Sequence, residues 1–179
     1  MARKARKPKK SEFSLRGVKA YVEKVSQKVA EQAAKDIITD LKILGPYWTG
    51  EFEAAWVAIP GATKQVPARL DSQFTIEERL SIEPKARKIT EPKVAPLRGT
   101  GLNSYSIGNL MKYRDIALDL KPGRYSESKR NTADQDWYVG YINGGLLAQT
   151  LKQATGKVAN NPKVKGFKGL AEANKRLGL

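Results

Sequence analysis

The most constraining feature of the chain is a run of apolar residues that recurs at steps of three and four between Leu15 and Leu44. This spacing predicts one amphipathic helix about 45 Å long. Gly45 and Pro46 predict its end, because glycine tolerates a left-handed cap and proline cannot continue the helix. The missing leucine heptads favour packing in a core over a coiled coil. The apolar face comprises Val18, Val22, Val25, Val29, Ala33, Ile37, Leu41 and Leu44.

The 179 residues fit one domain with appendages. We expect an α+β fold in which the long N-terminal amphipathic helix packs on a small, mainly antiparallel β-sheet, with short C-terminal helices and extended arms. Composition divides the chain into a basic N-terminal arm (1–14), the long helix with a Thr-Gly turn segment (15–60), a proline-rich charged insertion or hairpin arm (61–105), and the strands and C-terminal helices that complete the domain (106–179).

Alternating apolar residues predict the strands of this sheet. Two half-buried strands are expected in YRDIALDL and DWYVGYIN, and a strand pair or an extended hairpin that projects from the body is expected inside the insertion. The apolar segment 52–59 fits either the last turn of a helix or a strand. Segments 146–154 and 170–177 are short helix candidates, separated by a link at 156–169 that is rich in Gly, Asn, Pro and Lys. The alternating residues are Ile116, Leu118 and Leu120, then Trp137, Val139 and Tyr141, and in the insertion Phe74, Ile76, Leu80 and Ile82.

The chain contains no cysteine and no histidine. This excludes disulfide scaffolds, Cys/His zinc sites, thiol nucleophiles and His-based triads. With Asp71, the triplets Glu83–Lys85 and Glu91–Lys93 imitate the metal-binding motif of a nuclease. The middle residue of each triplet is proline, however, which would interrupt the strand that normally carries such ligands. We therefore interpret them as solvated charges.

Two other patterns lack the residues that their chemistry needs. Asp134 and Asp136 lie in a stretch rich in Ser, Asn and Asp, and are interpreted as turn residues. The glycines between Gly99 and Asn109 lack the third glycine of a dinucleotide-binding loop and are not followed by a phosphate-binding lysine, which favours a flexible turn. We expect no enzymatic activity, no metal and no cofactor.

The charge of the chain is strongly positive, with 33 Lys and Arg against 18 Asp and Glu and a formal net charge of +15. Such a balance favours polyanions or acidic protein surfaces as partners. Six of the cations lie in the first ten residues, which have no apolar periodicity and therefore predict an arm that docks on a partner. These six are Arg3, Lys4, Arg6, Lys7, Lys9 and Lys10. Neither a secretory signal nor an apolar run of membrane-spanning length is apparent.

Aromatic residues are concentrated just after the long helix, at Tyr47, Trp48, Phe52 and Trp56. Their density would suit the stacking of bases. Since Phe52 and Trp56 are flanked by alanine and valine, we expect them to lie in the core instead.

The segment YWTGEFEAAWV at 47–57 resembles a turn in the neck and tail-completion proteins of long-tailed bacteriophages. In that family a long N-terminal helix is followed by Thr-Gly, then Leu or Phe, and then Trp, and Thr49, Gly50, Phe52 and Trp56 match these positions. YINGGLLAQTL at 141–151 resembles the family's strand that ends in Asn and the helix after it, and Gly166–Phe167 its closing pattern. Glu53 stands where the family usually has arginine and Leu147 where it has tyrosine, and the insertion has no counterpart.

The resemblance implies a non-enzymatic structural subunit of a phage neck or head–tail junction, in which the four matched residues belong to the core. The subunit would be one copy of a closed ring, expected to be a hexamer, in the neck or tail of a virion assembled in the host cytoplasm. Its implied partners are further copies of itself, neighbouring connector and tail proteins, and packaged DNA in passing contact, with no membrane. The charge alone supports an alternative, a basic RNA- or DNA-binding protein such as a ribosome-associated or nucleoid protein.

Overall fold

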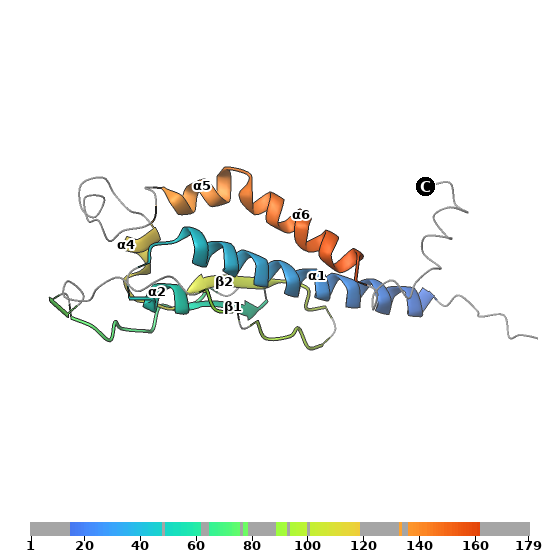
Figure 1. Ribbon diagram of the computed structural model, residues 1–179. Helices are drawn as coiled ribbons and strands as arrows, with labels where there is room; N and C mark the ends of the chain where they lie inside the picture. Colours follow the sequence, from blue (N-terminus) through green and yellow to red (C-terminus); the bar gives the residue numbers. More distant parts are fainter. Residues whose placement is uncertain are drawn as a thin grey trace, which may run out of the picture.

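The fold is α+β and is organised around one long helix. The computed structural model describes residues 15–47, 49–61, 65–75, 77–78, 89–92, 94–99, 101–118, 133 and 136–161. The helix α1 (Leu15–Leu44) lies between two layers (Figure 1). One layer holds α5 (Trp137–Asn143) and α6 (Leu146–Ala159), and the other a two-stranded sheet of β1 (Trp56–Pro60) and β2 (Tyr105–Asn109). Two short helices, α2 (Glu51–Ala54) and α4 (Arg114–Leu118), precede β1 and follow β2.

The bounds of α1 agree with the sequence prediction, but its buried surface is broader than one stripe. Ala34 and Ile38 are buried together with Ala33 and Leu41, whereas Val22 is 52% exposed. The reason is that the C-terminal half of α1 is covered from two sides, by the sheet and by α5 and α6. The N-terminal end extends beyond α6 (Figure 1).

Gly45 ends α1 for a different reason from the one expected. Its φ is not positive, so no left-handed cap forms. Its N–H donates a hydrogen bond to the Leu41 carbonyl oxygen at 3.0 Å. A Cβ at this position would lie 2.7 Å from that oxygen and 3.1 Å from the Trp137 ring. Glycine is therefore required by close approach rather than by its backbone conformation.

The small antiparallel sheet is present, but other residues form it. β1 and β2 pair in a register from Trp56 opposite Asn109 to Pro60 opposite Tyr105. The undecided segment 52–59 contributes to both α2 and β1. β2 lies in the stretch that was interpreted as a flexible turn, and that interpretation was wrong. Ser106 and Gly108 alternate there with the larger side chains of Tyr105, Ile107 and Asn109, and this strand-like alternation was not recognised.

Both strands predicted in the C-terminal part are helices instead. The residues expected at 116–120 fall in α4, as far as Leu118, and those expected at 137–141 fall in α5. Trp137 and Tyr141 fit an alternating pattern, but they are also four residues apart and thus share one face of a helix. Both are buried, while Val139 between them is 52% exposed, which is the helical pattern.

The predicted hairpin in the insertion is also not supported where residues are described. Phe74 lies in a bend, and Glu77 and Glu78 lie in a helical turn. Thr75 and Glu78 form a capping box there, since each backbone N–H bonds the other side chain, at 2.7 and 3.1 Å. Ile76, Leu80 and Ile82 lie outside the described residues.

The C-terminal end of the insertion lies along α1. The Glu31 carboxylate accepts the Leu97 N–H at 2.9 Å, and the Gln27 amide donates to the Gly99 carbonyl at 2.9 Å. Glu23, one further turn toward the N-terminus, accepts the Gly101 N–H. Three side chains spaced four residues apart thus bind the main chain of one extended segment, so this part of the insertion packs on the body and does not project from it.

The helix predicted at 146–154 is confirmed and runs five residues further, to Ala159, so that Gly156 lies inside it. α6 is antiparallel to α1, and Asp40 on α1 accepts hydrogen bonds from the Thr150 and Tyr141 hydroxyls at 2.5 and 3.2 Å. Lys157 forms an ion pair with Asp36 at 2.9 Å. The helix candidate at 170–177 and the arm at 1–14 lie outside the described residues. Among the described helices, none has the length and apolar character to span a bilayer.

Candidate functional site

Thr49 and Gly50, two of the residues on which the resemblance rests, form a tight turn between α1 and α2. Gly50 has a φ of +86°, a conformation that favours glycine, and it opens α2. The Thr49 hydroxyl accepts the Glu51 N–H at 3.4 Å. This turn redirects the chain from α1 into α2 and β1.

The aromatic residues of this segment point into the core. Phe52 and Trp56 are both buried, and their rings meet edge to face with centroids 5.7 Å apart. Tyr113 stacks on Phe52, with ring centroids 6.2 Å apart. Neither Phe52 nor Trp56 is available for stacking on a base. Tyr47 is half-buried, and Trp48 lies outside the described residues.

Asn109 joins this turn to the end of β2, and the sequence analysis did not single it out. Its side chain is 1% exposed. The amide donates to the Phe52 carbonyl oxygen at 2.7 Å and accepts the Met111 N–H at 3.0 Å. A buried amide that satisfies two backbone groups fixes the position of both segments. No local sequence pattern marks Asn109, because its partner Phe52 lies 57 residues earlier in the chain.

Glu51 connects the same turn to the start of the insertion. One carboxylate oxygen accepts the Gln73 N–H at 2.7 Å, and the other accepts the Ser72 hydroxyl at 2.7 Å. Thr49 also donates to this second oxygen at 3.3 Å. The turn therefore holds residues 72 and 73 of the insertion against the body.

Glu53, at the family's usual arginine position, is buried and has a charged partner. Lys42 on α1 lies 3.7 Å away and is equally buried. The Lys42 ammonium group also donates to the Thr90 hydroxyl and carbonyl oxygens at 3.0 and 3.2 Å. Removing either charge alone would leave the other buried without its partner, which is costly. The pair ties together α1, α2 and the insertion.

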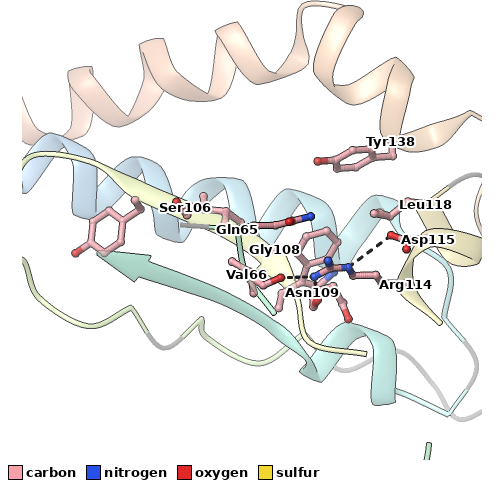
Figure 2. A pocket seen from close by; sticks show the side chains of 12 residues that line it. Gln65, Val66, Ser106, Gly108, Asn109, Arg114, Asp115, Leu118 and Tyr138 are labelled. Atoms are coloured by element: carbon pink, nitrogen blue, oxygen red, sulfur yellow. Dashed lines mark hydrogen bonds and ion pairs between the residues drawn. The ribbon is translucent and has the colours of Figure 1, made fainter. Parts of the chain in front are cut away.

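A pocket of about 420 Å³ opens between β2, α4 and α5, with Arg114 at its edge (Figure 2). One guanidinium nitrogen of Arg114 donates to the Val66 and Asn109 carbonyl oxygens, and Nε lies 3.5 Å from Asp115. The Arg114 side chain therefore binds two main-chain carbonyl groups and one carboxylate of the protein itself. Tyr138 of α5 lies across the pocket from it. The lining contains one cation and one carboxylate, already paired with each other, and this arrangement holds segments in place.

The acidic candidates of the sequence analysis do not gather in the described structure. Asp71 is exposed and pairs with Lys112 at 2.8 Å, and Glu91 is exposed. Asp136 has a φ of +59° and precedes α5. Glu83, Lys85, Lys93 and Asp134 lie outside the described residues. Where residues are described, no three acidic groups come close enough to hold a metal ion.

The cations of the arm also lie outside the described residues, as do Gly166 and Phe167. These cations are Arg3, Lys4, Arg6, Lys7, Lys9 and Lys10.

Comparison with protein-family models, with curated proteins and with solved structures gives no match for this chain.

Proposed function

We propose that this chain is a structural subunit of a bacteriophage neck or head–tail junction, one copy of a closed ring through which the genome passes. The observation that carries the proposal is the hydrogen bond from Asn109 to the Phe52 carbonyl, which joins the Thr-Gly turn to the end of β2 beneath a long N-terminal helix. It joins the Thr-Gly turn, which carries the resemblance, to the small sheet beneath α1.

The order of elements gives further support. The family pattern implies a strand that ends in Asn and is followed by a helix. β2 ends at Asn109, and α4 begins five residues later at Arg114. Tyr113 stacks on Phe52, and Ala117 of α4 is buried in the same core. The chain thus contains a strand that ends in Asn and is followed by a helix, but at 105–118 and not at 141–151, where the resemblance was drawn and where the structure has α5 and α6.

The departure at Glu53 is compatible with the proposal, because its charge has a partner in Lys42. A buried acidic residue can be accommodated at this position because Lys42 of α1 provides a charge of opposite sign beside it. The work of such a subunit is mechanical. Asn109, Arg114 and the Lys42–Glu53 pair hold the segments of the body together. Heterologous contacts between copies would close the ring by rotation.

The proposal is tested by removing the chain from a phage that encodes it. Electron microscopy of the resulting lysate should show DNA-filled heads and finished tails that have not joined, or heads that have lost their DNA. Supplying the chain in trans should restore joined particles. Complete, infectious virions made without the chain would contradict the proposal.

The net charge of +15 favours a second function, the binding of nucleic acid. Lys24, Lys28 and Lys35 on α1 are spaced so that they share one helical face, and Lys24 is exposed. If phosphate contacts on this face and the arm are the function, the purified chain binds duplex DNA at moderate salt, and the logarithm of its affinity falls steeply with the logarithm of salt concentration. Absence of binding at 150 mM salt would dismiss this second function.

A further inference from the structure

The outward face of α5 is apolar although it lies at the surface. Val139 and Ile142 are 52% and 40% exposed, and their spacing of three residues puts them on one side of the helix. Trp137 and Tyr141, on the opposite side, are buried. Leu146, the first residue of α6, is 47% exposed and follows directly after the Gly144–Gly145 junction. We call Val139, Ile142 and Leu146 the α5 face.

The charge pattern around this face is unusual for the chain. No charged residue occurs from Trp137 to Leu151, the longest uncharged run in a sequence that is 28% charged. A run of this length with average composition would hold about four charges. Asp136 and Lys152 bound it. The α5 face is therefore both apolar and neutral.

These two properties indicate which partner fits. Two copies that each carry +15 repel one another wherever their lysines meet, and charges buried in a contact also lose their hydration. A neutral apolar surface avoids both costs and gains about 25 cal/mol for each Å² of apolar area removed from water. A polyanion gains nothing here, because the run supplies no cation to neutralise a phosphate.

We infer that the α5 face is the contact surface for a second copy of this chain. The inference rests on the proposed ring and specifies which part of the subunit faces its neighbour. α5 and α6 form the outer layer of the described structure on this side of α1, so α5 can approach another molecule without rearrangement of the core (Figure 1). In a ring closed by heterologous contacts, the α5 face of each copy meets one neighbour. Closure of the ring raises the effective concentration of the last contact, so each contact can be modest.

The absence of native cysteine allows a direct test with single-cysteine variants. Val139→Cys places a thiol on the α5 face, and Val22→Cys places one on α1 at the same 52% exposure. Maleimide labelling rates of both variants are measured on the assembled protein and on protein diluted until it is monomeric. We expect assembly to slow the labelling of Val139→Cys at least tenfold more than that of Val22→Cys. An unchanged ratio of the two rates would overturn the inference.

A second pair of variants tests the energetics of the same surface. Leu146→Glu adds a charge to the α5 face and should raise the dissociation constant of the assembly at least tenfold. Leu70→Glu makes the same change at a residue of similar exposure, 41%, on another part of the surface and should leave it unchanged. Circular dichroism and thermal melting of each variant establish that it is folded. A folded Leu146→Glu protein that assembles like the wild type would contradict the inference.

The outcomes separate the inference from the proposed function. If the wild-type chain forms a ring but assembly does not change the ratio of the Val139→Cys and Val22→Cys labelling rates, the proposed ring stands and only the assignment of the α5 face is wrong. If the wild-type chain stays monomeric at every concentration, both the proposed ring and the α5 contact are wrong. Anionic lipid vesicles are the third arm of the test. If they protect Val139→Cys while the chain remains monomeric, the face binds a lipid surface and the inference fails.

Discussion

At the scale of single residues, two polar side chains, buried Asn109 and half-buried Arg114, hold several segments together through hydrogen bonds to the main chain. Asn109 bonds one carbonyl and one N–H of two different segments, and the Arg114 guanidinium bonds two further carbonyls. Thr49 and Gly50 were identifiable from sequence because a turn has a local signature. Asn109 was not, because its value lies in contact with Phe52, which is 57 residues away.

Replacing Asn109 by alanine should lower the free energy of unfolding by about 2–4 kcal/mol, because two buried backbone groups lose their partners. Asn143→Ala, at an exposed residue at the end of α5, should change it by less than about 0.5 kcal/mol. Urea unfolding of the two variants measures both values. An effect of Asn109→Ala no larger than that of Asn143→Ala would show that this amide does not hold the turn.

Tyr141 gives the fold a dependence on alkaline pH. Burial raises the pKa of its phenol from 10.0 to about 12, and the nearby Asp40 carboxylate also contributes to the increase. The unfolded chain thus releases this proton near pH 10, while the folded chain keeps it. The resulting stability is fully present below pH 10 and is lost as the pH rises toward 12. Thermal melting from pH 8 to 11 should show a decrease that is smaller in Tyr141→Phe, and equal slopes would contradict this role.

At the scale of elements, long periodic segments were predictable and short ones were not. α1 offers eight turns of apolar spacing, so its bounds could be predicted to the residue. α5 is seven residues long, and its apolar positions fit periods of two and of 3.6 equally well. β2 pairs with a strand almost fifty residues earlier, and no local pattern specifies that partner. The α+β class was correct because two other segments, β1 and β2, form a small antiparallel sheet on α1.

The attachment of α6 to α1 should depend on hydroxyl donors to Asp40. Thr150→Val keeps the volume of the side chain and removes a charge-assisted hydrogen bond, so it should cost about 1–3 kcal/mol in unfolding free energy. Thr155 lies on the same helix, is exposed, and bonds only the Leu151 carbonyl in the described structure, so Thr155→Val should cost less than about 0.5 kcal/mol. Equal effects of the two changes would assign α6 docking to apolar contacts alone.

At the scale of the whole molecule, charge is distributed unevenly along the chain: the segment that contains α5 is uncharged, and the N-terminal segment is strongly basic. Six of the cations fall in residues 1–10, while the run from Trp137 to Leu151 has no charge. Composition alone predicted the basic arm. The neutral α5 face could not be predicted from sequence, because a strand in that place would have turned Val139 toward the core together with Trp137 and Tyr141.

Deleting residues 1–10 should leave the melting temperature of the isolated protein within about 2 °C of the wild type, since six of the ten are cations and the segment offers little apolar area to bury. Incorporation into particles should weaken, and more so as salt rises, because the arm's ion pairs are screened. If the deletion instead removes DNA binding and lowers the salt slope by about five, as six phosphate contacts would, the arm serves nucleic acid.

The mass of the assembled protein tests the central claim most directly. The account predicts that native mass spectrometry of the purified 19.8 kDa chain finds a closed oligomer, expected to be a hexamer, and that negative-stain images of it show rings with a central hole. A chain that remains monomeric at every concentration, and that gains mass only by binding duplex DNA, would contradict it.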